Sequence, residues 1–185
     1  GAGQLGDGTT IDKSSPVLVS WNYLPTNSWS MVNNISSTVT AIDSTGTLYT
    51  WGVNNQGQLG DGTTIAKSSP IQIGSKSWSM VSGGPSYSTA IDSTGALYTW
   101  GINNSGQLGQ NNYLPKSSPV QVATSFAGVN SWTGIPATGA THSVALNNLN
   151  NLYTWGINTT GGLGDGTTAS RSYPIQAMLG SYSLI

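Results

Sequence analysis

The chain has 185 residues with a net charge of −1 and only 6% charged side chains, so it lacks the basic surface that nucleic-acid or anionic-membrane binding requires. No apolar run approaches the roughly 20 residues of a membrane-spanning helix. The absence of cysteine excludes disulfides, a thiolate nucleophile and cysteine-based zinc or iron–sulfur sites. A hydroxyl-rich, cysteine-free surface with few charges favours, by composition alone, an extracellular or virion-borne protein.

One stretch is repeated along the chain. It reads LYTWGVNNQGQLG at 48–60, LYTWGINNSGQLG at 97–109 and LYTWGINTTGGLG at 152–164, and the chain opens on the tail of a further copy at 3–6. Copies separated by about 50 residues are typical of stacked supersecondary units.

Each unit is predicted to contain four short strands, here called A, B, C and D. In chain order, strands C and D are expected at 16–19 and 28–32, followed by an A–B hairpin at 40–51 and by C and D at 70–73 and 77–81. The same order predicts hairpins at 89–100 and 144–155, with the following C and D strands at 119–122, 131–135, 174–177 and 181–185. No segment sustains the period of about 3.6 residues that marks an amphipathic helix, so almost no helix is expected.

The turn between strands A and B has the chemistry of a tight hairpin. It reads Asp-Ser-Thr-Gly at 43–46 and at 92–95, where Asp accepts a local backbone hydrogen bond and Gly supplies a positive φ. In the third unit the turn is Asn-Asn-Leu-Asn at 147–150, and Asn is the next-best residue for a left-handed conformation. These turns place A and B at the centre of each unit.

Four short strands per unit, with large side chains on both faces of strand B, indicate an all-β protein built as a β-propeller. The sequence divides into a C–D half repeat at 1–35 and three repeats at 36–82, 83–135 and 136–185. An open arc of blades would expose two apolar faces to water, so we expect these residues to form part of a longer propeller.

The repeated motif resembles a known family. LYTWGxNxxGQLGDGTT followed by Lys-Ser-Ser-Pro, together with Gly-Ala-Thr-His-Ser-Val-Ala-Leu at 139–146, is similar to the repeats of the regulator of chromosome condensation family. The resemblance covers essentially the whole chain and implies a seven-bladed propeller, of which about three and a half repeats are present. In the best-known member, one face exchanges guanine nucleotide on a small GTPase and the other meets chromatin, whereas other members are bacterial, viral or extracellular binding modules.

The sequence contains no set of residues that predicts catalysis or cofactor binding. Asp7, Asp61 and Asp165 share one repeat position; a calcium site needs six to eight oxygens, so turn residues before Gly are the favoured interpretation. A second position holds four of the five basic residues, which form either a cationic arc or, the favoured interpretation, parts of the scaffold loops (Lys13, Lys67, Lys116 and Arg171). The one histidine, His142, is expected to be a buried hydrogen-bonding residue, as is common in the family.

The favoured function is therefore that of a non-enzymatic module that displays loops to a protein partner or to further propeller blades, with no cofactor and no metal. A small-molecule ligand is not expected. The alternative is a guanine-nucleotide exchange factor for a small GTPase. A site is expected where the repeat is broken, in two C–D connections that are longer than the others.

These longer connections carry the predicted partner-binding residues. The first, between 19 and 28, contains Trp21, Tyr23 and Leu24, and the second, between 122 and 131, contains Phe126. Aromatic side chains in protruding loops are typical binding anchors. The other interpretation, which the sequence leaves open, is that Trp21 and Phe126 fold back and cover blade edges.

Overall fold

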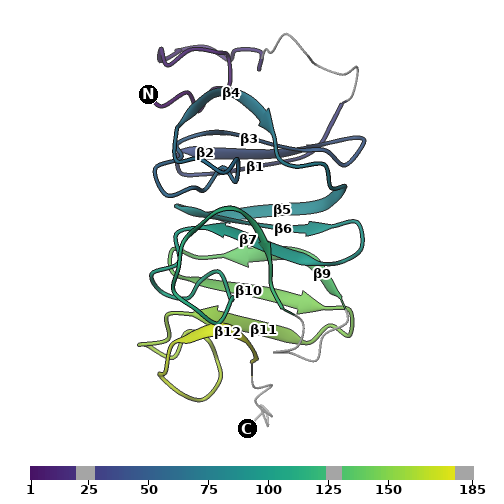
Figure 1. The fold of residues 1–185 in the computed structure, drawn as a ribbon, viewed down its shortest axis with the longest axis vertical. Coiled ribbons are helices and arrows are strands. Elements are labelled where there is room, and N and C mark those ends of the chain that lie inside the picture. Colours follow the sequence, from purple (N-terminus) through teal and green to yellow (C-terminus); the bar gives the residue numbers. More distant parts are fainter. Residues whose placement is uncertain (20–27, 124–130, 178–185) are drawn as a thin grey trace, which may run out of the picture.

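The computed structural model describes residues 1–19, 28–123 and 131–177, and all the regular structure in these ranges is β-strand (Figure 1). The strands form three four-stranded antiparallel sheets, which we call blades 1, 2 and 3. Blade 1 consists of β1 (Trp29–Ile35), β2 (Thr38–Asp43), β3 (Leu48–Gly52) and β4 (Lys67–Gln72). Blade 2 consists of β5 (Trp78–Gly84), β6 (Tyr87–Asp92), β7 (Leu97–Gly101) and β8 (Lys116–Gln121). Blade 3 consists of β9 (Trp132–Thr138), β10 (His142–Asn147), β11 (Leu152–Gly156) and β12 (Arg171–Gln176). The partial β-propeller predicted from the sequence is confirmed.

The central hairpins form as the turn residues predict. The carboxylate of Asp43 accepts hydrogen bonds from the backbone N–H groups of Thr45 and Thr47, both at 2.9 Å. Gly46 then takes φ 84°, a conformation that strains any residue with a Cβ. In the third hairpin Asn147 makes the equivalent bonds and Asn150 takes φ 62°. The amide therefore replaces the carboxylate without changing the turn.

The blade is out of phase with the sequence repeat. The sequence predicted blades in the order A, B, C, D, whereas each observed blade runs D, A, B, C, because strand D pairs with the strand A that follows it. Only two residues separate strand D from strand A in blade 1, at Ser36 and Ser37. A connection of that length closes a hairpin, while the longer C–D connection crosses to the next blade.

The strand C predicted at 16–19 is not formed, and this expectation was wrong. Strand C pairs with strand B of its own blade, and residues 1–15 form no strand with which it could pair. The first residues instead act as a B–C loop packed on blade 1. The carbonyl oxygen of Gln4 accepts a bond of 3.0 Å from Trp51 Nε1, and the Gly8 N–H donates to the Ser68 carbonyl at 2.9 Å. The strand D predicted at 181–185 lies outside the described residues.

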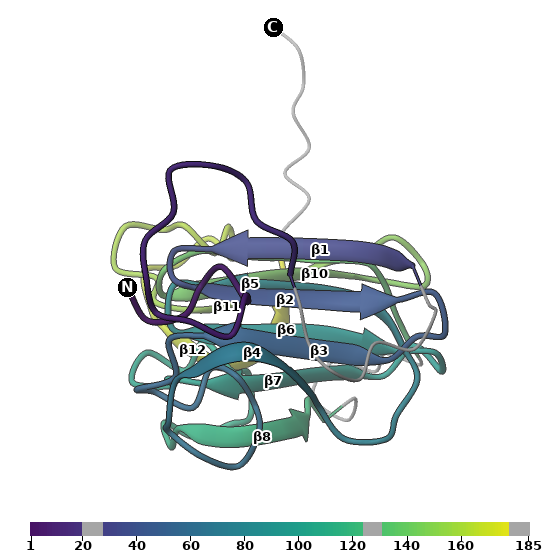
Figure 2. The same ribbon diagram turned by 90° about the horizontal axis from the view of Figure 1, so that it is seen from above.

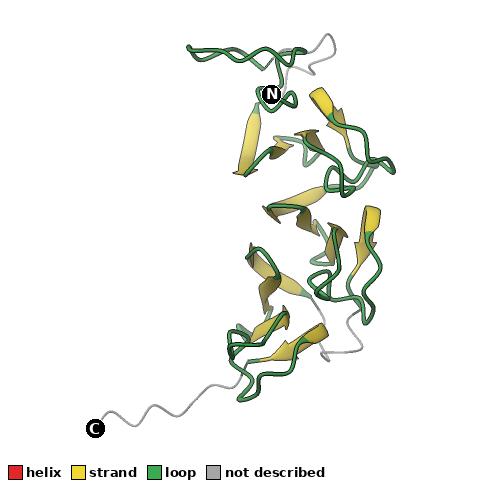
Figure 3. Ribbon diagram, turned by 90° about the vertical axis from the view of Figure 1, so that its left-hand side faces the viewer, coloured by secondary structure: helices red, strands yellow, loops and turns green. Residues whose placement is uncertain are grey.

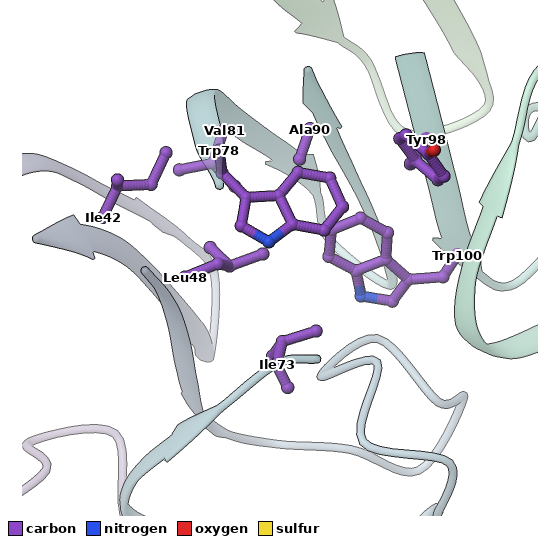
Figure 4. Close-up of a cluster of buried hydrophobic side chains, with 8 residues drawn as sticks. All are labelled: Ile42, Leu48, Ile73, Trp78, Val81, Ala90, Tyr98 and Trp100. Atoms are coloured by element: carbon purple, nitrogen blue, oxygen red, sulfur yellow. The ribbon is translucent and has the colours of Figure 1, made fainter. Parts of the chain in front are cut away.

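Apolar side chains fill the space between successive blades. Between blades 1 and 2, Figure 4 shows the indole of Trp78 lying between Ile42 and Leu48 of blade 1 on one side and Trp100 of its own blade on the other. The Trp78 and Trp100 ring centroids are 6.3 Å apart, and Trp78 meets the Tyr98 ring edge-on at 5.2 Å. The same aromatic arrangement recurs at Trp132 in blade 3. The tryptophans at these two repeat positions thus pack between blades.

The blades follow one another as an arc of parallel layers. Strand β5 contacts β1 and β2 on one side and β9 on the other, so the first strands of the blades are the ones that lie together, at the inner edge. Seen from above, the blades overlie one another, with β1 to β4 crossing the array in that order (Figure 2). Figure 3 shows the three sheets in succession. The outer edge is formed by β4, β8 and β12, which each pair with one strand only.

Because neighbouring strands in each blade are antiparallel, the connections between strands lie on two opposite sides of the arc. We call the side with the A–B turns and the C–D connections the turn face. We call the opposite side, with the B–C loops at 53–66, 102–115 and 157–170, the loop face.

Candidate functional site

A buried asparagine organises each loop of the loop face. Asn103 is fully buried; its Oδ1 accepts from the Leu108 N–H at 3.0 Å, and its Nδ2 donates to the carbonyl oxygens of Asn112 and Leu114. Asn54 and Asn158 make the corresponding bonds in blades 1 and 3. Because these amides bind their own loops, Asn103 and Asn158 are structural residues, although each begins a glycosylation sequon.

The loop face also carries ion pairs between the repeated aspartates and the repeated basic residues. Asp165 accepts two hydrogen bonds from the Arg171 guanidinium, at 2.8 and 3.0 Å, and Asp61 lies 3.3 Å from Lys67 Nζ. The Arg171 bonds hold the pKa of Asp165 well below its usual value. Burial alone would raise the pKa of Asp61, but bonds from Thr63, Lys67 and Asn54 outweigh it and lower the pKa. Asp7 and Lys13 pair similarly at 3.7 Å.

These contacts show that the repeated aspartate and the basic residue paired with it stabilise the loop that carries them. The carboxylate of each of the three aspartates also accepts a hydrogen bond from the backbone N–H of the threonine two residues later, as in a turn. Among the described residues, no group of three His, Asp or Glu side chains is placed to hold a metal ion, and no helix could span a membrane.

Blade 2 departs from this pattern. Its loop has Gln110 in the aspartate position, and the Gln110 amide donates inward to Thr99 Oγ1 at 3.0 Å. Lys116 consequently has no acidic partner, while every other basic side chain in the described part of the chain forms an ion pair.

On the turn face, the C–D connections end beside the A–B turns. The Ser93 N–H donates to the Ser77 carbonyl at 2.9 Å, and the Asn148 N–H donates to the Ser131 carbonyl at 3.1 Å. The Ser44 N–H makes the equivalent bond to Ser28. The C-terminal ends of the two long connections are therefore fixed on the turn face. The predicted binding residues themselves, Trp21, Tyr23, Leu24 and Phe126, lie outside the described residues.

A pocket of about 390 Å³ opens beside the short C–D connection between blades 1 and 2. Ile73 and Pro119 provide apolar walls, and Trp78 and Tyr98 an aromatic side. Asp61, from the B–C loop of blade 1, also lines the pocket. Lys76 enters from the connection, with its Nζ 3.4 Å from Asp92 Oδ2 and 4.9 Å from the centroid of the Tyr98 ring. The pocket thus combines aromatic surface with a half-exposed ammonium group, a mixture that suits a side chain of another protein.

Sequence reasoning did not identify this pocket. Lys76 was nevertheless the one basic residue outside the repeated position, and that exception was the available signal. The buried Nε1 of Trp78 has no acceptor among the described residues, but the Nε1 of Trp132 has none either. This feature therefore belongs to the repeated position and not to the pocket.

Tyr87 and His142 occupy the same repeat position but differ in burial. Tyr87 is fully buried, its hydroxyl donates to the His142 carbonyl at 2.7 Å, and burial raises its pKa well above the usual value. His142 itself is only partly buried, which corrects the expectation of a core histidine. Tyr87, at the same repeat position in blade 2, is covered by blade 3, whereas His142 stands on the last described blade and has no such cover.

A family model for the regulator of chromosome condensation (RCC1) repeat matches residues 45–91, 94–146 and 150–181. The chain belongs to this family. Each of the first two matched segments begins near strand B and ends in strand A of the next blade, so the RCC1 repeat itself crosses the blade boundary. No curated protein sequence matches the chain.

Solved structures share the RCC1-type propeller. Human WBSCR16 aligns with a TM-score of 0.83 at 22% identity, over 96% of this chain and 46% of that one. Prp20p from Saccharomyces cerevisiae aligns with a TM-score of 0.69 at 19% identity, over 82% of this chain and 39% of that one. The chain spans less than half the length of either protein, and identities this low show the fold alone.

Proposed function

We propose that this chain is part of a non-enzymatic propeller scaffold that binds a protein partner on its turn face. The observation that carries the proposal is the pocket beside Ile73 and Lys76, which lies at the short C–D connection between the two longer ones. Residues that recur in all three blades build the scaffold. Partner recognition therefore falls to the residues that do not recur.

The two longer connections complete the proposed surface. The structure fixes Ser28 and Ser131, their C-terminal ends, on the same face as Lys76. Trp21, Tyr23, Leu24 and Phe126 are proposed as anchors that insert into a partner, with the pocket receiving one of the partner's side chains. Large aromatic anchors surrounded by polar residues dominate the binding energy of many protein interfaces.

Known relatives support protein binding as the class of activity. The structure of Prp20p was described together with its binding properties to Gsp1p and histones. Another structure shows yeast RCC1 (Prp20) with Kap60 bound; it has a TM-score of 0.70 and 19% identity over 82% of this chain and 37% of that one. We extend to this chain only the use of the propeller as a protein-binding scaffold.

The proposal is tested with a partner captured from the source organism, purified, and titrated against variants of this chain. We expect Trp21→Ala with Phe126→Ala, and separately Lys76→Ala, to weaken binding by roughly tenfold or more. Ile11→Ser is the matched control, because Ile11 is 65% exposed in the first loop of the loop face and belongs to neither proposed site. Loss of affinity confined to the loop-face variant would refute the assignment. Accelerated nucleotide release from a small GTPase partner would instead establish the exchange-factor alternative.

A further inference from the structure

The B–C loop of blade 2 breaks the repeat in a way that leaves one positive charge unpaired. Where the other loops read Gly-Asp-Gly-Thr-Thr, this loop reads Gly-Gln-Asn-Asn-Tyr at 109–113. Gln110 turns inward to Thr99, and Asn112 Oδ1 accepts from the Leu114 N–H as the hydroxyl of Thr63 accepts from the Ile65 N–H in blade 1. The loop keeps its fold while the carboxylate that would pair with Lys116 is lost.

Lys116 lines a pocket of about 320 Å³ between the loops of blades 1 and 2. Asn55, Gln56 and Thr64 form the side from blade 1, and Pro115 and Ser117 complete the side from blade 2. None of these neighbours is acidic, and the repeated carboxylates of the loops in blades 1 and 3, Asp61 and Asp165, are bound to Lys67 and Arg171. The pocket therefore offers one ammonium group and several neutral hydrogen-bonding groups.

Apolar side chains stand beside this pocket on the same two loops. Tyr113 is 55% exposed, Leu114 63% and Ile65 66%. Large apolar groups held in solvent next to an unpaired charge are characteristic of a recognition surface. In blade 3 the loop has Ala169 where blade 2 has Leu114, so the apolar group at this position is much smaller there.

We propose that this pocket binds an acidic residue of a peptide segment, whose carboxylate pairs with Lys116 while adjacent apolar residues pack on Tyr113 and Leu114. A single carboxylate matches the single charge. Nucleic acid is a poorer match, because phosphate backbones are bound by several cations and the pocket contains one. The site is distinct from the turn face, and neither assignment depends on the other.

The test uses the 185-residue chain labelled with ¹⁵N and titrated with the probe acetyl-Leu-Glu-Leu-amide. We expect saturable shifts at the amides of Asn55, Gln56, Lys116 and Ser117, with a dissociation constant on the order of 1 mM. The uncharged probe acetyl-Leu-Gln-Leu-amide should bind at least roughly tenfold more weakly, and added salt should weaken the charged probe.

Four variants separate the specific charge from general effects. Lys116→Gln should abolish the shifts and Lys116→Arg should keep them, since Arg171 occupies the same position in blade 3. The triple variant Gln110→Asp, Asn111→Gly, Asn112→Thr restores the repeat sequence and should silence the site by pairing Lys116 internally. Lys67→Gln is the control for loss of a lysine at the same position of blade 1. Absence of saturable shifts, equal binding of both probes, or full binding by the triple variant would each overturn the proposal; dispersed spectra confirm that the variants fold.

Discussion

The indole Nε1 of Trp100 donates a hydrogen bond of 2.9 Å to the carbonyl oxygen of Gln58, a residue of the preceding blade. The Ser88 hydroxyl donates to the same carbonyl at 2.9 Å. Trp155 bonds to Gln107 in the same way at the next junction. Each junction thus fixes the loop of one blade against the tryptophan of the next, and the segments at 57–60 and 106–109 that make these contacts both read Gly-Gln-Leu-Gly.

Gly60 lies so close to Trp100 that adding a single methyl group there should destabilise the junction between blades 1 and 2. A Cβ on Gly60 would lie 2.7 Å from Trp100 Nε1, whereas one on Gly62 would meet nothing closer than 3.6 Å. Both glycines have φ near +80°, so the backbone strain of an alanine is shared. We expect Gly60→Ala to be less stable than Gly62→Ala by about 1–3 kcal/mol in denaturant unfolding. Equal losses would show that the junction can widen freely.

Removing a loop asparagine should be far more damaging than removing its neighbour. Asn103→Ala leaves the Leu108 N–H and the carbonyls of Asn112 and Leu114 without their buried partner. We expect a loss of roughly 2–4 kcal/mol in unfolding free energy. Asn104→Ala, at an exposed position one residue later, is the control and should change stability little. Similar midpoints for the two variants would contradict the role assigned to Asn103.

The aspartates of the loop face should make the fold sensitive to acid. The pKa values of Asp165, Asp61 and Asp7 are lowered in the folded chain, so these groups bind protons more readily when it is unfolded. Their contribution is complete above the unfolded pKa of about 3.9 and is lost as the pH falls below it toward the folded values. The melting temperature should therefore change little from pH 7 to pH 5 and fall below about pH 4.

A substitution can assign part of this acid sensitivity to a named group. Asp165→Asn should be less stable than the unaltered chain at neutral pH and should show a smaller further decline in acid. Asp12→Asn is the control, because the Asp12 side chain is 95% exposed. An unchanged acid profile in the Asp165 variant would exclude this ion pair as a source of the sensitivity.

The outward face of blade 3 should cause self-association. Leu146 and Leu152 are 36% and 37% exposed, whereas their equivalents in blade 2, Ile91 and Leu97, are at most 1% exposed. Contact between this face and another copy of the chain would bury apolar side chains and so favour association. We expect Leu152→Thr to reduce association in sedimentation velocity while the chain remains folded. Leu97→Thr, by contrast, should unfold it, because that side chain fills the core between blades 2 and 3. Association that is unaffected by Leu152→Thr would place the contact elsewhere.

The sequence predicted the hairpins well because their determinants are local. An Asp or Asn beginning the turn and a Gly or Asn ending it specify the hairpin within a few residues. Blade membership of strand D was missed, since it depends on which neighbour the strand pairs with. The two-residue connection between Ile35 and Thr38 carried that information.

The candidate sites were predictable only in part. Aligning the repeats placed Asp61 and Lys67 in separate repeat positions, but it did not show that Asp61 and Lys67 pair with each other. Consequently the unpaired state of Lys116, which follows directly from Gln110, became apparent only from the geometry. Lys76, the basic residue outside the repeated position, was not singled out from the sequence. Trp21, Tyr23, Leu24 and Phe126 remain predictions from sequence.

The offset between repeat and blade has a consequence for how such arrays change length. Each C–D connection leaves strand C at the outer edge of one blade and leads to strand D at the inner edge of the next. A cut between two sequence repeats therefore separates strand D from the other three strands of its sheet and does not remove a whole blade. Loss or gain of one complete repeat, by contrast, always joins a strand C to a strand D through a C–D connection of the existing kind. This holds wherever in the repeat the deletion or duplication begins. The number of repeats can therefore change by whole repeats without requiring a new type of contact between blades.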